Sequence, residues 1–265
     1  MSDSLGRIAA MTLRYWYLLR ASWPRLIELV YWPTMNMIVW GLLTFWFTDN
    51  QSATLETAGS LLGAVMLWDV LFRGQLGFTF SFLEEVWSRN VANLMMSPLR
   101  PAEFAVSLMV MSLMRLVVGM APVTLLALML FNFNIYGLGL GLVAFFANLM
   151  FTSWSVGLAV SGLILRNGSG AQSFAWSVMM LLLPVSCVYY PVTILPAWLQ
   201  PIAWSLAPTY VFEGMRAALI DGVFRADLML EGFALNLVYL GLGVMTFVLL
   251  TQSARHKGTL LTMGE

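Results

Sequence analysis

Residues 116–165 read LVVGMAPVTLLALMLFNFNIYGLGLGLVAFFANLMFTSWSVGLAVSGLIL, fifty residues without one charged side chain. A transmembrane helix needs about 20 apolar residues, so this stretch predicts two membrane spans joined by the tight turn Asn132-Phe133-Asn134. Similar uncharged stretches recur along the chain. The sequence therefore predicts an all-α fold, a polytopic integral membrane protein.

The composition supports this class. Hydrophobic residues make up 60% of the chain and charged residues 10%, whereas soluble domains carry about 25% charged residues. The 13 basic and 13 acidic side chains cancel, so nothing electrostatic favours nucleic acid as a partner. With one cysteine, Cys187, and one histidine, His256, we expect no metal site.

Six spans follow from the uncharged runs, and together they predict one transmembrane domain over residues 1–265. They lie at roughly residues 27–48, 58–83, 104–131, 136–165, 172–190 and 232–253. If both termini lie on one side, that side holds nine of the Lys and Arg residues and the other side holds two, Arg216 and Arg225. Because basic residues are enriched on the cytoplasmic side, we expect a multi-pass protein of the cell (inner or plasma) membrane with both termini cytoplasmic.

Two segments outside the spans also carry membrane-like patterns. Residues 1–26 separate a face with Arg7 and Arg14 from an apolar face, which predicts a helix in the membrane interface; the alternative is a basic flank that only sets topology. Residues 191–231 are apolar but carry four prolines, which predicts short re-entrant helices on the outward side. The alternative is a pair of helices lying flat on the outer surface.

Asp69, Arg73 and Arg115 lie well inside predicted spans. Asp69 and Arg73 are four residues apart, the favourable order for an ion pair on one helix. Intramembrane charges are costly, so this pair either lines a translocation path or neutralises itself for helix packing. Arg115 has no acidic residue near it in the sequence, so it either joins Asp69 or extends toward the interface.

Two segments carry a family resemblance. The first is FLEEVWSRNVANLMMSPLRPAEF, residues 82–104, and the second is ILPAWLQPIAWSLAPTYVFEGMRAAL, residues 194–219. Both resemble the permease subunits of ABC transporters of the type-2 exporter family. The residues that match its motifs are Glu84, Glu85, Ser97 and Pro98 in the first segment, and Leu195, Pro196, Trp198, Leu199, Pro208, Tyr210, Glu213 and Arg216 in the second.

The resemblance implies a membrane subunit of an ATP-driven exporter. Such a permease pairs with a second copy of itself and with two ATP-binding cassette ATPase subunits, which hold ATP and Mg. Residues 84–103 would be the segment that couples to the ATPase. Within it Glu84, Glu85 and Arg89 would pair with the partner and Trp87 would supply apolar contact, while Ser97 and Pro98 mark its end. Tyr210, Glu213 and Arg216 would form an outward gate.

The chain itself carries no nucleotide-binding signature. Its one lysine, Lys257, follows His256 and is therefore not part of a Gly-Lys-Ser/Thr phosphate-binding loop. We expect no enzymatic activity and no cofactor in this chain. Two other functions stay open: a secondary transporter, and a membrane assembly subunit that transports nothing. The sequence does not identify the substrate, which could be a drug, a lipid or a glycan.

Overall fold

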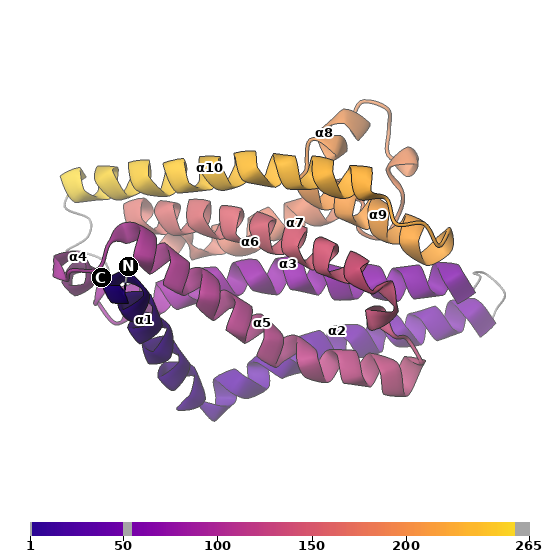
Figure 1. Ribbon diagram of the computed structural model, residues 1–265, viewed down its shortest axis with the longest axis horizontal. Helices are drawn as coiled ribbons and strands as arrows, with labels where there is room; N and C mark the ends of the chain where they lie inside the picture. Colours follow the sequence, from indigo (N-terminus) through magenta and orange to yellow (C-terminus); the bar gives the residue numbers. More distant parts are fainter. Residues whose placement is uncertain (1, 50–54, 258–265) are drawn as a thin grey trace.

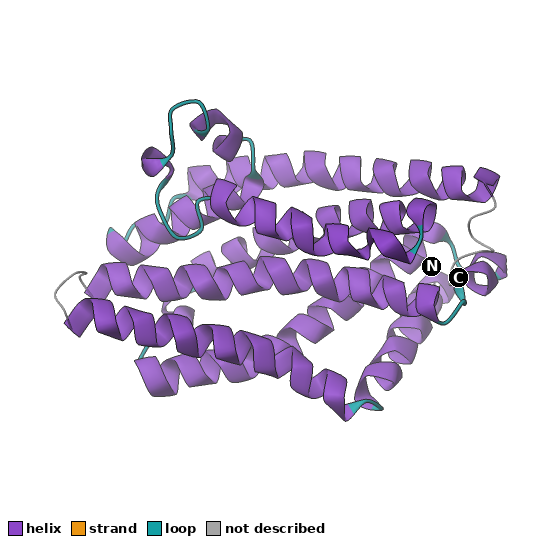
Figure 2. Ribbon diagram, turned by 180° about the vertical axis from the view of Figure 1, so that it is seen from behind, coloured by secondary structure: helices purple, strands orange, loops and turns teal. Residues whose placement is uncertain are grey.

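The computed structural model describes residues 2–49 and 55–257, and the regular elements of these residues are all helices (Figures 1 and 2). Within the described residues, five helices are long and apolar enough to cross a membrane. They are α2 (Trp23–Asp49), α3 (Leu55–Trp87), α5 (Pro101–Phe131), α6 (Leu140–Asn167) and α10 (Ala226–Lys257). The prediction of an all-α polytopic membrane protein is confirmed.

The predicted fifth span is much shorter than the others. It corresponds to η2 (Ser169–Gln172) and α7 (Ser173–Val185), which has 13 residues. At 1.5 Å per residue, α7 rises about 20 Å, less than the roughly 30 Å of a hydrocarbon core. The helix ends because Cys187 adopts a left-handed conformation with φ of 53°, which breaks helical geometry.

α3 is the central helix of the bundle (Figure 1). It packs against α2, α5, α6 and α7, and against α9 (Ala207–Ile220). Because it is covered on several sides, it is apolar around most of its circumference, as expected of a buried helix. Asp69 and Glu85 of this helix are therefore buried, and the side chains of Arg73 and Glu84 are largely buried.

α6 and α10 are joined by a buried polar network. Thr152 donates a hydrogen bond to Asn236 over 2.6 Å, and Asn236 donates to the Asn148 side chain over 3.1 Å. The helices also come close at Gly243, where an added Cβ would lie 2.7 Å from the Ser155 carbonyl oxygen. Interhelical hydrogen bonds and small residues are typical of helix packing in membranes.

The turn predicted between the third and fourth spans is confirmed. α5 ends at Phe131, and Asn132 follows in the left-handed region with φ of 52°, which asparagine tolerates. The Asn134 side chain accepts a hydrogen bond from the Tyr136 N–H at the start of η1 (Ile135–Leu138). The chain then enters α6.

The two ends of the bundle differ in what caps them (Figure 1). One end carries α1 (Ser2–Arg20), α4 (Val91–Met96) and the end of α10; we call it the α4 end. The other carries η3 (Val192–Ile194) and α8 (Gln200–Trp204), and we call it the α8 end. Figure 2 shows from behind the long loop between α7 and α9, which contains η3 and α8.

α9 is a helix of the bundle rather than a surface element. It packs against α3, α6 and α10. Its residues Val211, Phe212 and Met215 are fully buried. The predicted outward segment 191–231 is therefore helical in short pieces, one of which lies among the long helices.

Candidate functional site

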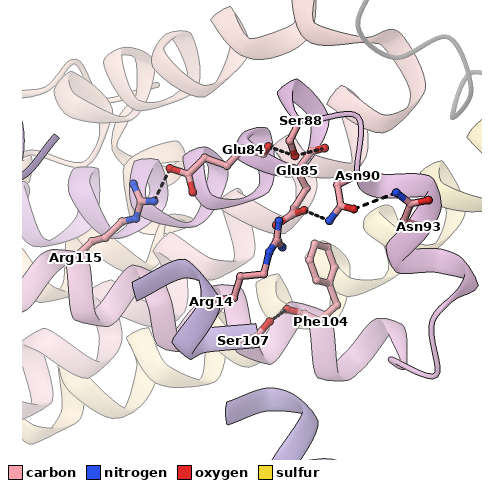
Figure 3. A network of polar contacts seen from close by, with 9 residues as sticks. All are labelled: Arg14, Glu84, Glu85, Ser88, Asn90, Asn93, Phe104, Ser107 and Arg115. Carbon is pink, nitrogen blue, oxygen red and sulfur yellow. Dashed lines mark hydrogen bonds and ion pairs between the residues drawn. The ribbon is translucent and has the colours of Figure 1, made fainter. Parts of the chain in front are cut away.

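Glu85, near the end of α3, is fully buried at the α4 end. Arg14 of α1 donates a hydrogen bond to one carboxylate oxygen, and Asn90 donates to the other over 2.7 Å (Figure 3). Burial acts to lower the pKa of Arg14, but the hydrogen bond and negative charge of Glu85 outweigh it and raise this pKa above its ordinary value. Glu85 therefore fastens α1 to the start of the predicted coupling segment.

The neighbouring Glu84 joins three helices. One of its carboxylate oxygens accepts from Arg115 of α5 over 2.9 Å and from Arg25 of α2 over 3.0 Å; Figure 3 shows the contact with Arg115. Arg115 thus pairs with Glu84, which was neither of the alternatives that the sequence left open, a contact with Asp69 or extension toward the interface. Both glutamates, expected to face an ATPase, bind arginines of their own chain.

A third buried carboxylate, Glu103, was not predicted as a site residue. It accepts hydrogen bonds from Arg7 over 2.6 Å and from Ser4 over 2.6 Å, both in α1. It also accepts from the backbone N–H of Arg100 over 3.0 Å, at the start of α5. A glutamate in the first turn of a helix that begins with Pro101 was the signal for this contact.

The basic face of α1 therefore points into the protein. Arg7 and Arg14 reach Glu103 and Glu85, while Leu5 and Leu13 are exposed. The separation of faces predicted from the sequence is present. Its polar side contacts the bundle together with Tyr15 and Leu19, which are fully buried, whereas Leu5 and Leu13 are left uncovered.

The link from α3 to α4 is a tight turn centred on Arg89. Arg89 has φ of 54°, in the left-handed region. Its N–H donates to the Val86 carbonyl over 3.0 Å, and the Asn90 N–H donates to the Glu85 carbonyl over 2.9 Å. This hydrogen-bond pattern is the Schellman motif that ends many helices. It turns the chain sharply out of α3.

α4 itself ends at the predicted Ser-Pro step. Ser97 donates to the Leu94 carbonyl over 2.6 Å and takes an extended conformation with ψ of 162°, as a residue before proline prefers. Trp87 and Met96 flank this segment with 52% and 79% of their surface exposed. The segment thus combines a fixed backbone with exposed apolar side chains.

A cavity of about 790 Å³ lies between α2, α3, α5 and α7. Tryptophans from three of these helices line it, as do both charged groups predicted inside the second span. Arg73 Nε lies 3.6 Å from an Asp69 carboxylate oxygen, so the predicted ion pair is present. Arg115 and Glu84 line the same cavity, nearer the α4 end.

A second cavity, of about 770 Å³, lies at the α8 end and is lined by Tyr210, Glu213 and Arg216. Glu213 accepts hydrogen bonds from the Val192 N–H over 2.7 Å and from Arg216 over 3.0 Å. Arg216 also donates to the Val188 carbonyl over 3.3 Å. The pair therefore ties α9 to residues 188–192, the segment that follows α7.

Tyr189 lines both cavities. Its ring stacks on Trp40 of α2, with centroids 4.6 Å apart and an interplanar angle of 25°. The neighbouring backbone is the part held by Glu213 and Arg216. Nothing in the sequence pattern singles out this residue, because an aromatic side chain in an apolar segment is ordinary.

Comparison with known families gives a match over most of the chain. The family model described as ABC-2 type transporter matches residues 9–220, most of the chain. No curated protein matches the chain.

Proposed function

The chain belongs to the ABC-2 type transporter family, and on this basis we propose that it is the membrane-spanning subunit of an ATP-driven exporter. It works as a homodimer with two separate ATP-binding cassette ATPase subunits, which bind and hydrolyse ATP with Mg. The chain itself has no catalytic role. Its place is the cell membrane, with the α4 end in the cytoplasm.

The observation that carries this proposal is the ion-pair cluster at the α4 end. Glu84, Glu85 and Glu103 connect α1, α2, α3 and α5. α4 is attached to this cluster through the Schellman turn at Arg89. A displacement of α4 by a partner would therefore move several helices together, which a coupling segment requires.

The surface that meets the ATPase is apolar and basic rather than acidic. The carboxylates of Glu84 and Glu85 are engaged inside the chain, whereas Trp87, Met96 and Pro98 are exposed. Exposed tryptophan is typical of energetic centres in protein interfaces. We assign the docking contact to these side chains and to Arg89, and a positioning role to Glu84 and Glu85.

Six membrane crossings fit the path of the chain. α6 ends near the α4 end and α10 begins near the α8 end, so the chain crosses between them (Figure 1). α7 with the following residues up to η3 is the segment that makes this crossing. α1 lies in the cytoplasmic interface, with its exposed leucines toward lipid.

The transported molecule moves along the two cavities. The first contains Asp69 and Arg73, and the second contains the outward gate of Tyr210, Glu213 and Arg216. Tyr189 lines both cavities, and we assign to it the barrier between them. Opening of this barrier requires the segment 188–192 to leave its contacts with α9.

The decisive experiment purifies the chain with a P-loop ATPase and measures ATP hydrolysis in liposomes. We expect co-elution and hydrolysis stimulated by this chain. Trp87→Ala should weaken both, while Trp198→Ala, at the α8 end and 71% exposed, should weaken neither.

The same liposomes separate the alternative functions. Transport driven by an ion gradient without ATP would identify a secondary transporter. If the chain neither associates with an ATPase nor transports a substrate, it is an assembly subunit. Equal effects of the two tryptophan variants would reject the docking surface.

A further inference from the structure

Arg73 offers more hydrogen-bond donors than its surroundings use. Its guanidinium carries five N–H donors, yet its contact with Asp69 is a long 3.6 Å. Its Nε atom is buried with no hydrogen-bond partner among the described residues. A charged group with open donors inside a membrane protein is costly unless a ligand satisfies it.

Arg115 also has a hydrogen-bond donor without a partner in the described part of the chain. Its Nε is also buried without a hydrogen-bond partner within the described residues. Its guanidinium, however, is held by Glu84 over 2.9 Å. The two arginines line one cavity, and Arg73 is the less committed of the two.

Most of the remaining lining of this cavity is apolar and aromatic, and Arg25, Glu28 and Asn36 of α2 add polar groups to it. Trp32, Trp68, Phe72 and Trp176 contribute to its walls. The α3 positions of Arg73 and Glu84 are eleven residues apart, or about 16 Å along the helix. The cavity can therefore hold an acyl or aromatic body alongside a charged head.

We propose that this cavity binds an amphiphile with one anionic head group, a carboxylate or a phosphate, whose head is held by Arg73. Planar guanidinium groups bind such anions with two parallel hydrogen bonds. Asp69 competes with the ligand for Arg73 and so keeps the affinity moderate, which allows release. This inference rests on the proposed function, since it names the class of molecule that the exporter carries.

The position of the head group follows from the charges present. Of the three carboxylates that line the cavity, Asp69 and Glu84 each lie beside an arginine, so a cationic head at either would have to displace that arginine. The third, Glu28, is exposed on α2, and binding of a cationic head there is the outcome that the amine probe detects. An anionic head at Arg73 displaces only the long contact to Asp69. A cationic amphiphile is therefore an outcome of the test and not part of the proposal.

The test uses the full chain in neutral detergent micelles, without the ATPase, and tryptophan fluorescence as the signal. The probe is dibromostearate, because bromine quenches tryptophans that it contacts. Its methyl ester and the matching amine have the same tail without the negative charge. We expect saturable quenching by the acid, and weaker, non-saturating quenching by the ester and the amine.

Single variants of the two residues of this ion pair should change the affinity for the acid in opposite directions. Arg73→Gln should weaken binding of the acid at least about tenfold, as expected for loss of charge-assisted hydrogen bonds. Asp69→Asn should tighten it severalfold, because Arg73 loses its competing carboxylate. The double variant Asp69→Asn with Arg73→Gln keeps the charge balance and should bind like Arg73→Gln. If the pair is purely structural, both single variants should bind the acid more weakly.

Competitors distinguish the source of the anion. Lysophosphatidate should displace the probe, and inorganic phosphate at millimolar concentration should not. Displacement by inorganic phosphate, equal quenching by acid and ester, tighter binding of the amine, or an unchanged Arg73→Gln variant would each overturn the proposal. Since no ATPase is present, failure of coupled transport would not produce any of these results.

Discussion

The α4 end and the α8 end both place glutamates beside arginines, but they connect very different parts of the chain. At the α4 end, Glu85 reaches Arg14 across 71 positions and Glu103 reaches Arg7 across 96. At the α8 end, Glu213 contacts Arg216 three positions away and Val192 across 21. One cluster joins distant helices, whereas the other holds a single segment in place.

The surroundings of the two clusters differ in the same way. Glu85 is fully buried, while the Glu213 side chain keeps 20% of its surface exposed and faces a cavity. Contacts that tie many helices resist local opening, and contacts at a cavity edge can be exchanged. The comparison indicates an α4 end that moves as one body and an α8 end that opens.

The strongest challenge to this comparison is Glu85→Ala. It leaves Arg14 and Asn90 without their acceptor, and hydrogen bonds that involve a charged group contribute about 1.5–3 kcal/mol each. We expect a large fall in thermal stability in detergent and lost binding of the ATPase. Glu85→Gln keeps an acceptor for Arg14 and should recover part of the stability. If Glu85→Ala were as stable as the parent protein, the α4 end would not be a rigid unit.

A second test addresses the α8 end through Glu213→Ala. The variant removes the acceptor of the Val192 N–H and of Arg216, a loss of about 1–3 kcal/mol. We expect transport to fall while ATP hydrolysis persists with weaker coupling, because residues 188–192 are released. Asp227→Asn, in an exposed ion pair with Arg225, is the control and should change neither. A parallel loss of protein and of both activities would leave only a structural role for Glu213.

The barrier between the two cavities gives a smaller effect. Tyr189→Ala removes the stacking on Trp40, worth about 0.5–1.5 kcal/mol beyond burial. We expect more ATP hydrolysed per molecule transported in liposomes, because the cavities are less well separated. Tyr189→Phe keeps the ring and should behave like the parent protein. Unchanged coupling in Tyr189→Ala would mean that the barrier lies elsewhere.

The sequence predicted the features that depend on local pattern. Uncharged runs predicted α2, α3, α5, α6 and α10, since hydropathy alone indicates helices that cross a membrane. Pairs three or four residues apart, Asp69 with Arg73 and Glu213 with Arg216, were also found, because helix geometry places such residues on one face.

Features that depend on distant contacts were missed. Nothing in the pattern connects Glu84 with Arg115, because their contact depends on how α3 packs against α5. The shortness of α7 was missed for a different reason. Residues 172–190 are apolar throughout, but Cys187 has a left-handed backbone that hydropathy does not reveal.

The smallest predicted effect concerns Arg89, which forms the tight turn between α3 and α4 at the α4 end. A left-handed conformation costs a non-glycine residue about 1 kcal/mol, and glycine is the usual residue at this position of a Schellman motif. Arg89→Gly should therefore be more stable than Arg89→Ala by about 0.5–1 kcal/mol. Arg89→Ala removes the same charge without relieving the backbone, so it should not gain stability.

If Arg89 contacts the ATPase, both variants should lose affinity for it to a similar extent, measured by co-elution. Unchanged affinity in both variants would assign Arg89 to the turn alone. An Arg89→Gly variant that is no more stable than Arg89→Ala would contradict the left-handed geometry of this turn.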